Sequence, residues 1–514
     1  MKAIRACVGL LAGVLVLACG SDGSGGRSSK GIAAGGSGGG AGAGGSGGAV
    51  GEGGTGGVGG SGGSGQGGDG GSGGEALVPY DDPTGRSGTR LRRRYFEAGT
   101  GAWMTTDFWD TELEVACSFR TAVDGAIRCL PRTFDDVYYT DAGCSEPFIG
   151  TFRDWPPACS DGWAMAADNR IYRRTGEPAV LSGGRVYYRT STGCEAFAIL
   201  PQEAWTLELV PASRFVRGQR VDEARADGLV ARFVEGDDGS RALLEVVHQT
   251  RGYTCSFTED GRCLPQRRSS RMRYADAACT QPLAYYSVPE PPPLIAFEGE
   301  DNACLQPNQV WETGPRFEGS RAYRRTDEGC VEFTVLSWDY YYRLGAEIPA
   351  HELPRATRTT EGDGRLLARR WVDSNGDVLG RAYAFWDTAF DEECEPVQVG
   401  ADRLACVPRA RGRAATGVYS SPGCAPGTEI ALASSCLGSA PRLLSGVQPA
   451  GVCPAVPNLP VVDGVYERGP DVGPSIWVQG VSDCFESTYG ALQRAYGFGP
   501  DASGELPYLE LKME

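Results

Sequence analysis

The feature that most constrains the fold of this chain is an internal repeat of about 138 residues. The tetrapeptide Phe108-Trp109-Asp110-Thr111 returns as Phe385-Trp386-Asp387-Thr388, and Val247-His248-Gln249-Thr250 lies halfway between them. The same interval separates Arg128-Cys129-Leu130-Pro131, Arg262-Cys263-Leu264-Pro265 and Ala405-Cys406-Val407-Pro408. A fixed period decides the architecture before any local pattern does. The repeat predicts three copies of one unit, over residues 76–225, 226–362 and 363–514.

Each unit has the sequence pattern of β-structure. Residues 90–97, 229–235 and 366–372 have the length and the aromatic or β-branched content of strands. Each is followed by a turn sequence: Gly99-Thr100-Gly101, Asp237-Asp238-Gly239 or Asn375-Gly376. Pro and Gly interrupt nearly every candidate helix. The fold class is therefore predicted to be all-β.

The ends of the units suggest how they are arranged. Near its end each unit has a tripeptide of the form Leu-Val-Pro or Glu-Leu-Pro, and a fourth copy, Leu77-Val78-Pro79, precedes the strands of the first unit. These elements are Leu209-Val210-Pro211, Glu352-Leu353-Pro354 and Glu505-Leu506-Pro507. Matching pieces at both ends favour a propeller-like ring closed by the meeting of its termini. Tandem β-sandwiches joined by repeated linkers are the alternative.

The first 19 residues are predicted to be a lipoprotein signal peptide. Lys2 and Arg5 precede an apolar run that is too short to span a bilayer. The run ends in Val16-Leu17-Ala18-Cys19, which resembles a bacterial lipobox, so Cys19 is the expected lipidation site and the lipid bilayer an expected partner. Because Gly20 follows the cysteine where a retention signal would have aspartate, the outer membrane is the favoured address within the cell envelope.

Residues 20–75 are predicted to be a disordered tether. Between residues 20 and 74 there are 31 glycines, interleaved with Ser and Ala, and such a segment cannot bury enough apolar surface to fold. The formal net charge of the chain is −16, and it arises entirely from residues 76–514. A surface of this charge argues against nucleic acid as a partner.

Cysteine usage agrees with export. Without Cys7 and the lipidated Cys19, 16 of the 18 cysteines remain, an even number suited to an oxidising compartment. Close spacing predicts three disulfides, Cys117–Cys129, Cys255–Cys263 and Cys394–Cys406. Alignment of the units predicts three more: Cys159–Cys194, Cys304–Cys330 and Cys453–Cys484. In the third unit alone Cys424 has a neighbour 12 residues away, which predicts Cys424–Cys436. Cys144 and Cys279 are then either free or joined to each other.

The sequence contains no recognisable catalytic motif, and a non-enzymatic protein is expected. The only histidines are His248 and His351, each in the second unit alone, and His248 aligns with Trp109 and Trp386. A carboxylate hydrolase using Asp110 and Asp387 is an alternative, provided the fold brings the two side chains together.

Calcium is the one cofactor that the sequence suggests. Asp373, Asn375 and Asp377 place oxygen atoms at alternate positions around Gly376. Asn-Gly between two strands is also a strong hairpin signal, and the distal glutamate of a calcium loop is absent. A turn is the favoured interpretation, and no other metal or cofactor site is predicted.

The combination of lipobox, Gly-rich tether and Cys-containing β repeats, with Arg-Cys-Leu-Pro and Tyr-x-Asp-Ala-x-Cys segments, resembles a group of uncharacterised repeat lipoproteins from GC-rich Gram-negative bacteria. The resemblance covers the whole chain and implies an address and a repeat count, but no activity. We expect a surface or periplasmic lipoprotein that binds a glycan or an envelope protein. Exposed aromatic residues such as Trp103, Trp109, Trp163 and Trp205 are the candidate contacts. A structural envelope component without a specific ligand is the alternative.

Overall fold

The computed structural model describes residues 84–99, 101–132, 135–151, 162–166, 168–179, 181, 185–189, 193–197, 201, 203–266, 268–269, 273–286, 291–297, 309–326, 329–336, 339–434, 441–447, 452, 454–456, 459–473, 475–479, 484–488 and 493–514. Asp81–Glu514 form one compact unit of β-sheets, so the all-β prediction is confirmed. The predicted signal peptide, Cys19 and the tether lie outside the described residues. Within those residues, no helix has the length and apolar character needed to cross a membrane.

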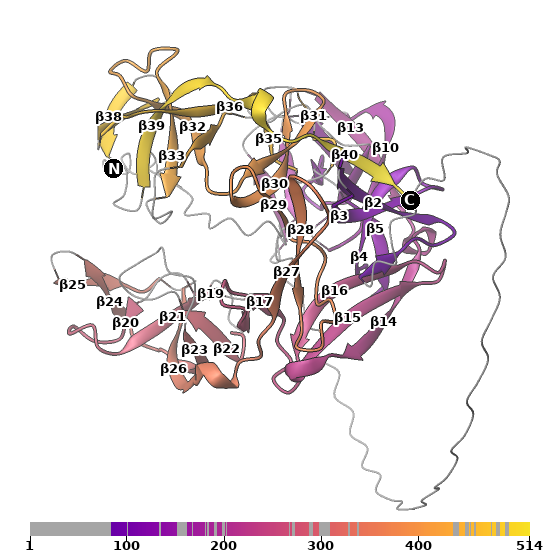
Figure 1. Cartoon of the computed structure of the whole chain (residues 1–514), viewed down its shortest axis with the longest axis horizontal. Helices are drawn as coiled ribbons and strands as arrows, with labels where there is room; N and C mark the ends of the chain where they lie inside the picture. Colours follow the sequence, from indigo (N-terminus) through magenta and orange to yellow (C-terminus); the bar gives the residue numbers. More distant parts are fainter. Residues whose placement is uncertain are drawn as a thin grey trace, which may run out of the picture. The chain divides into compact units, whose positions relative to one another are not determined.

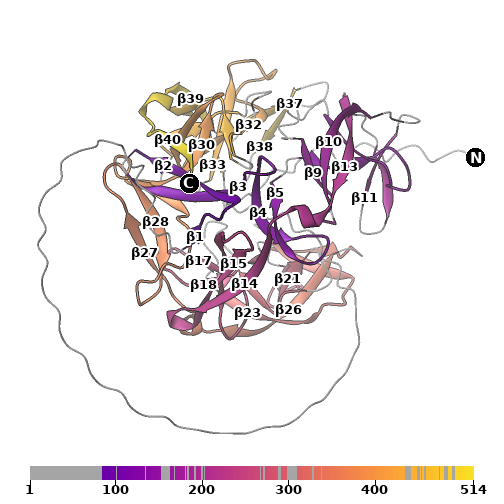
Figure 2. The same cartoon turned by 90° about the vertical axis from the view of Figure 1, so that its right-hand side faces the viewer.

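Three antiparallel meanders form one part of the fold (Figures 1 and 2). The first contains β2 (Leu91–Ala98), β3 (Trp103–Asp110), β4 (Val115–Thr121) and β5 (Ile127–Pro131). The second contains β14 (Arg217–Ala224), β15 (Leu229–Gly236), β16 (Arg241–His248), β17 (Cys255–Phe257) and β18 (Cys263–Pro265). The third contains β27 (Thr357–Glu361), β28 (Leu366–Val372), β29 (Ala384–Asp387), β30 (Glu392–Val399) and β31 (Arg403–Pro408). The short strand β1 (Gly85–Arg86) pairs with β16, and β35 (Val461–Val462) pairs with β30.

Local sequence explains why these segments form hairpins. Along β28 the burial of successive residues alternates, which matches the two-residue period of a strand with one face in the core. Gly239 and Gly376 occupy the turns after β15 and β28 with φ angles of +87° and +86°. Since side chains disfavour this left-handed region, glycine allows the chain to reverse at both positions.

The C-terminal strand completes the first meander. β40 (Leu509–Met513) pairs with β2 in antiparallel register, from Ala98 opposite Leu509 to Arg94 opposite Met513. β40 thus takes the position that β14 and β27 hold in the second and third meanders. The last residue, Glu514, forms an ion pair with Arg93, whose side chain is buried on β2.

Equivalent backbone contacts connect each meander to the strand that begins the next. The N–H of Cys129 donates to the carbonyl of Val216 (2.9 Å), that of Cys263 to Pro354 (2.8 Å) and that of Cys406 to Pro507 (3.1 Å). The third contact involves the segment that leads into β40, and β40 pairs with β2 of the first meander. The series of contacts therefore returns to the first meander.

Three hydrophobic clusters follow the same cyclic order. Phe108 and Val234 belong to a cluster shared by the first and second meanders. Leu229 and Ala356 belong to one shared by the second and third. Phe96, Phe385 and Leu509 belong to one shared by the third and first. Each meander therefore buries apolar side chains against both of the others.

A second sheet follows each meander. The first comprises β6 (Asp135–Asp136), β7 (Tyr138–Tyr139), β8 (Pro147–Thr151), β9 (Trp163–Met165), β10 (Ile171–Pro178), β11 (Val186–Arg189), β12 (Cys194–Phe197) and β13 (Glu203–Val210). The second comprises β19 (Arg268–Ser269), β20 (Arg273–Tyr274), β21 (Pro282–Tyr286), β22 (Leu294–Phe297), β23 (Gln309–Arg316), β24 (Arg321–Thr326), β25 (Gly329–Thr334) and β26 (Tyr340–Ile348). The third comprises β32 (Gly412–Tyr419), β33 (Glu429–Ser434), β34 (Leu443–Ser445), β36 (Val465–Asp471), β37 (Ser475–Gln479), β38 (Cys484–Thr488) and β39 (Gln493–Asp501).

The last of these sheets closes into a small barrel. β32 pairs with both β33 and β34, so the order β32-β33-β39-β36-β34 returns to β32. The first sheet has the corresponding order β7-β8-β13-β10-β9-β6, and the second has β20-β21-β26-β23-β22-β19. These sheets do not have the uniform four-stranded blades expected of a propeller, because they have seven or eight strands, include parallel pairs such as β6–β9, and the last of them closes on itself.

The disulfides agree with the sequence prediction only where the cysteines are close together. Cys117–Cys129, Cys255–Cys263 and Cys394–Cys406 each join paired strands of one meander, as predicted. The other four predicted pairings, including the closely spaced Cys424–Cys436, were wrong for the cysteines that the structure describes. It contains Cys144–Cys194, Cys279–Cys330 and Cys424–Cys484 instead. The proposed partners Cys159, Cys304, Cys436 and Cys453 lie outside the described residues.

Strand pairing within the second sheets explains the correction. β7 pairs with β11, and this places the turn that ends in Cys144 beside Cys194 at the start of β12. Asp141 fixes that turn, since its carboxylate accepts the N–H groups of Ser145 (2.8 Å) and Glu146 (2.9 Å). Cys144 is therefore neither free nor joined to Cys279.

A candidate ligand-binding groove

The two carboxylates considered for catalysis are buried in separate ion pairs. Asp110 accepts hydrogen bonds from Arg90 Nε (2.8 Å) and Nη2 (2.7 Å), and Asp387 is held in the same way by Arg365 (both 2.8 Å). Neither aspartate is exposed to solvent. Each arginine also donates to a main-chain carbonyl that follows one of the second sheets: Arg90 to that of Arg214 (2.8 Å) and Arg365 to that of Glu505 (2.9 Å). Such bidentate, charge-assisted bonds give both carboxylates a structural role.

The second meander lacks this ion pair. Leu91 lies opposite Asp110 and Leu366 opposite Asp387, and in the same register Leu229 lies opposite His248. His248 therefore occupies the position of the aspartates, and its predicted alignment with Trp109 and Trp386 was wrong by one residue. The residue before Leu229 is Gly228, where the other meanders have Arg90 and Arg365.

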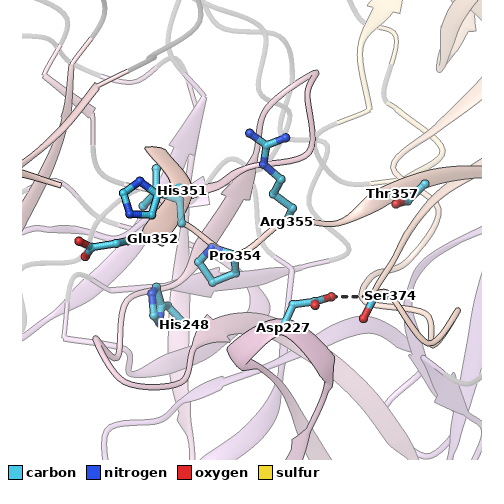
Figure 3. Close-up of a pocket in the computed structure, with 9 residues that line it drawn as sticks. Asp227, His248, His351, Glu352, Pro354, Arg355, Thr357 and Ser374 are labelled. Carbon is cyan, nitrogen blue, oxygen red and sulfur yellow. Dashed lines mark hydrogen bonds between the residues drawn. The ribbon is translucent and has the colours of Figure 1, made fainter. Parts of the chain in front are cut away.

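A groove of about 480 Å³ lies beside this position, lined by His248 and by Asp227, the residue before Gly228. Its walls include Asp227 from η3 (Ala226–Gly228), His248 from β16, and Ser374 from the β28–β29 turn. The segment around η4 (Ala350–Glu352) forms another wall, with His351, Glu352 and Arg355 (Figure 3). Both histidines of the chain thus line one groove, although they lie far apart in the sequence.

His248 has a buried ring nitrogen without a hydrogen-bond partner beside this groove. The residue is 6% exposed, and its Nε2 atom is buried with no hydrogen-bond partner in the described part of the chain. Nδ1 lies 3.5 Å from the hydroxyl of Thr250, and the ring packs edge-on against Tyr253, with the two ring centroids 5.0 Å apart. Burial lowers the pKa of His248, and the nearby charge of Arg251 lowers it further. His248 is therefore neutral at pH 7, with one nitrogen able to accept a hydrogen bond.

The charged groups of the groove differ in how they are engaged. Glu352 accepts a hydrogen bond from Arg251 (2.8 Å), and Asp227 accepts the N–H of Ser374 (3.0 Å). The backbone of Arg355 bridges to Arg262, but its exposed side chain has no hydrogen-bond or ion-pair partner among the described residues. The groove therefore combines acceptors from Asp227, His248 and the Glu352 segment with one available cation.

The lowered pKa of His248 predicts a pH effect on stability. Its folded pKa lies below the ordinary value of 6.5, so the contribution of neutral His248 is present above that pH and is lost as the pH falls through the folded pKa. We expect the Tm of the wild type to fall more between pH 7.5 and pH 5 than the Tm of His248→Gln. The two proteins differ at this one residue, so effects of pH on the rest of the chain cancel in the comparison. Equal losses of Tm would contradict a neutral, buried His248.

The candidate calcium loop is a hairpin turn in this structure. Asp373 Oδ1 accepts the N–H groups of Asn375 and Asp377, both at 2.9 Å, and Oδ2 accepts the N–H of Ala226 at 2.9 Å. Since three N–H groups already engage this carboxylate, it is not directed toward a cation. Among the described residues, no group of three or more His, Cys, Asp or Glu side chains is arranged to hold a metal ion.

The tryptophans considered for ligand stacking have arginines over their rings. Arg93 and Arg370 lie 5.2 and 4.4 Å from the ring centroid of Trp103, and Arg94 lies 5.5 Å from that of Trp109. Trp163 and Trp205 have similar neighbours. These cation–π contacts occupy ring faces that a sugar would need. The groove, which the sequence analysis did not find, is therefore the stronger candidate site.

Comparison with known proteins identifies the family of the chain. Residues 74–442, well over half of the 514 residues, match DUF7481, a family of unknown function. The chain belongs to the DUF7481 family. No curated protein and no solved structure matched it. In this DUF7481 protein the matched region contains every residue of the groove. The six disulfides among the described cysteines indicate an oxidising, non-cytoplasmic compartment for it.

Proposed function

We propose that this DUF7481 protein is a non-enzymatic binding module of the cell envelope. In this proposal Cys19 carries a lipid that anchors the protein, with the outer membrane favoured, and residues 20–75 tether the β unit to the bilayer. The groove of the second meander captures an envelope or extracellular partner. Disulfides that join neighbouring strands would keep such a module folded outside the cytoplasm.

The observation that carries the proposal is the difference between the three meanders. At equivalent positions the first and third contain Arg90 and Arg365, each bonded to a buried aspartate. The second contains Gly228 and His248 and has a groove there instead. A purely structural repeat would gain from the ion pair in all three copies. Opening a cavity with an unpaired buried nitrogen costs stability, and this cost is typical of a binding site.

The architecture that we propose for the family follows from the shared strand orders. The chain is proposed to contain three copies of a unit, each made of a meander and a second sheet, with β40 closing the series. The three equivalent backbone contacts from Cys129, Cys263 and Cys406 support this arrangement. The three clusters shared between successive meanders support it as well.

A binding screen with a blocked groove tests the proposed function. Ser374 is exposed on the groove wall, so Ser374→Trp fills the groove without disturbing the core. Asn375→Trp places the same side chain one residue further along the turn, outside the groove, and is the matched control. We expect at least one compound from panels of peptides, polyamines and envelope glycans to raise the Tm of the wild type and of Asn375→Trp, but not of Ser374→Trp.

Two results of this screen would count against the proposal. If no compound in the panels binds saturably, the structural-component alternative gains support. If a compound binds all three proteins equally, a binding site exists but lies outside the groove. The carboxylate-hydrolase alternative has less support than either, because Asp110 and Asp387 are each held by an arginine.

A further inference from the structure

The molecule contains two examples of a guanidinium bound at the position of the groove. Arg90 donates two hydrogen bonds to Asp110 and one to the carbonyl of Arg214. Arg365 donates two to Asp387 and one to the carbonyl of Glu505. In both cases one acceptor is a side chain, that of Asp110 at the end of β3 or of Asp387 at the end of β29. The other acceptor is the carbonyl of the last residue of a short 3-10 helix, η2 (Ala212–Arg214) or η6 (Ser503–Glu505).

The groove keeps the acceptor positions and lacks the donor. His248 occupies the position of the aspartates, and Glu352, the last residue of η4, corresponds to Arg214 and Glu505. In the described structure no donor reaches the carbonyl of Glu352 or Nε2 of His248. In the neutral tautomer that has its proton on Nδ1, facing the Thr250 hydroxyl, Nε2 carries a lone pair, and binding of a donor at Nε2 requires this tautomer. The groove therefore has two acceptors without a donor, the buried Nε2 and the Glu352 carbonyl, where the other meanders bind a guanidinium.

The charges around the groove also suit a cationic group. Asp227, which precedes Gly228, adds a carboxylate to the same wall. The Glu352 carboxylate is neutralised by Arg251, so its carbonyl rather than its side chain is the open acceptor. Arg355 is the opposing charge, and Figure 3 shows its guanidinium directed away from His248 and Asp227. His351 lines the outer part of the groove and is exposed.

We infer that the groove binds a guanidinium group of a ligand, most simply an arginine side chain of a partner protein or peptide. The inference rests on the proposed binding function and specifies the chemistry that the groove recognises. The incoming guanidinium would donate to His248 Nε2 and to the Glu352 carbonyl, with Asp227 supplying the countercharge. A partner's arginine would then take the place that Arg90 and Arg365 hold within the chain.

Titration with N-acetyl-L-argininamide tests this inference on the whole chain. Its uncharged isostere, N-acetyl-L-citrullinamide, has the same shape without the positive charge. We expect saturable binding of the argininamide with a Kd of about 1 mM, as suits a ligand of this size, and at least tenfold weaker binding of the citrullinamide. Calorimetry or chemical-shift changes of the His248 ring protons would measure both.

The matched variant rebuilds the ion pair of the other meanders. Gly228→Arg together with His248→Asp supplies the missing guanidinium from the chain itself, and we expect it to weaken argininamide binding at least tenfold. Gly228 has a φ angle of +73°, which strains an arginine, although no atom within 4 Å would contact a new Cβ. If the double variant does not fold, Ser374→Trp tests the same groove, with Asn375→Trp as its control.

The possible outcomes separate this inference from the proposed function. Equal binding of argininamide and citrullinamide, or undiminished binding to the rebuilt or blocked groove, would overturn the guanidinium inference. So would the absence of saturable argininamide binding up to 20 mM. If another compound then binds the wild type but not Ser374→Trp, the groove still functions as a binding site. Binding of Zn²⁺ that requires both His248 and His351, without argininamide binding, would identify a metal site instead.

Discussion

Asp110→Asn is expected to lower the free energy of unfolding by about 3 kcal/mol, because it leaves the Arg90 guanidinium without its buried countercharge. Asp110 is fully buried, and the Arg90 side chain is 21% exposed. Asp110 also accepts the N–H groups of Glu112 (3.0 Å) and Leu113 (3.1 Å), so its loss loosens the turn between β3 and β4 as well. The effect should be near the lower end of the range for buried ion pairs, since Arg90 retains some contact with water.

Urea denaturation of the wild type and the variant measures this change. Glu112→Gln is the matched control, because Glu112 also pairs with Arg90 but its side chain is 52% exposed. An exposed ion pair of this kind contributes at most about 1 kcal/mol. Asp387→Asn should repeat the result in the third meander, where Arg365 is the partner. The hydrolase alternative requires the opposite pattern, loss of an activity with an unchanged Tm, and that outcome would refute the structural role.

The sequence was sufficient where the relevant contacts are local. Cys117 and Cys129 lie on adjacent strands of one hairpin, so their short separation in the sequence matched their pairing. Cys424 and Cys436 are equally close in the sequence, but Cys424 bonds to Cys484, so short separation alone was not sufficient. Cys144 and Cys194 are 50 residues apart, and their pairing depends on β7 lying beside β11. That adjacency is an antiparallel pairing between strands far apart in the sequence, which no local pattern reveals.

The groove was missed because of a one-residue error in the alignment of the repeats. Matching the threonines Thr111, Thr250 and Thr388 places His248 with the tryptophans. Counting back six residues from Cys117, Cys255 and Cys394 instead aligns Gln249 with Thr111 and Thr388, and His248 with the aspartates. The strand register agrees with this second alignment. The cysteines were the better reference because disulfide-bonded strands tolerate no shift in register.

Even the correct alignment would not have predicted that His248 and the residues around η4 line the same groove. His248 lies on β16, whereas His351 and Glu352 lie on a segment that returns after the whole second sheet. The Cys263–Pro354 backbone contact brings that segment against the second meander. The same contact in the third meander, from Cys406 to Pro507, positions β40, so the geometry of the groove and the closure of the chain have one structural origin.

Deletion of residues 509–514 is expected to have the largest effect on stability, because it removes the strand that completes the first meander. β40 pairs with β2 along five residues, and Leu509 is fully buried beside Phe96 and Phe385. Truncation of one fully buried leucine to alanine costs about 2–5 kcal/mol. Loss of the strand adds unpaired N–H and C=O groups on β2 and leaves the buried Arg93 without Glu514. We expect a total loss of more than about 5 kcal/mol, enough to unfold many domains.

Point variants separate the role of the closing strand from a general effect of shortening the chain. Leu509→Ala should lower the free energy of unfolding by about 3 kcal/mol, whereas Met513→Ala, on the same strand but 53% exposed, should change it by less than about 0.5 kcal/mol. Limited proteolysis of the deletion variant should produce a cut within residues 91–110 that the wild type resists, since β2 loses its outer neighbour and β3 depends on β2. An unchanged Tm after the deletion, with cleavage no faster than in the wild type, would show that the meanders are stable without closure by β40.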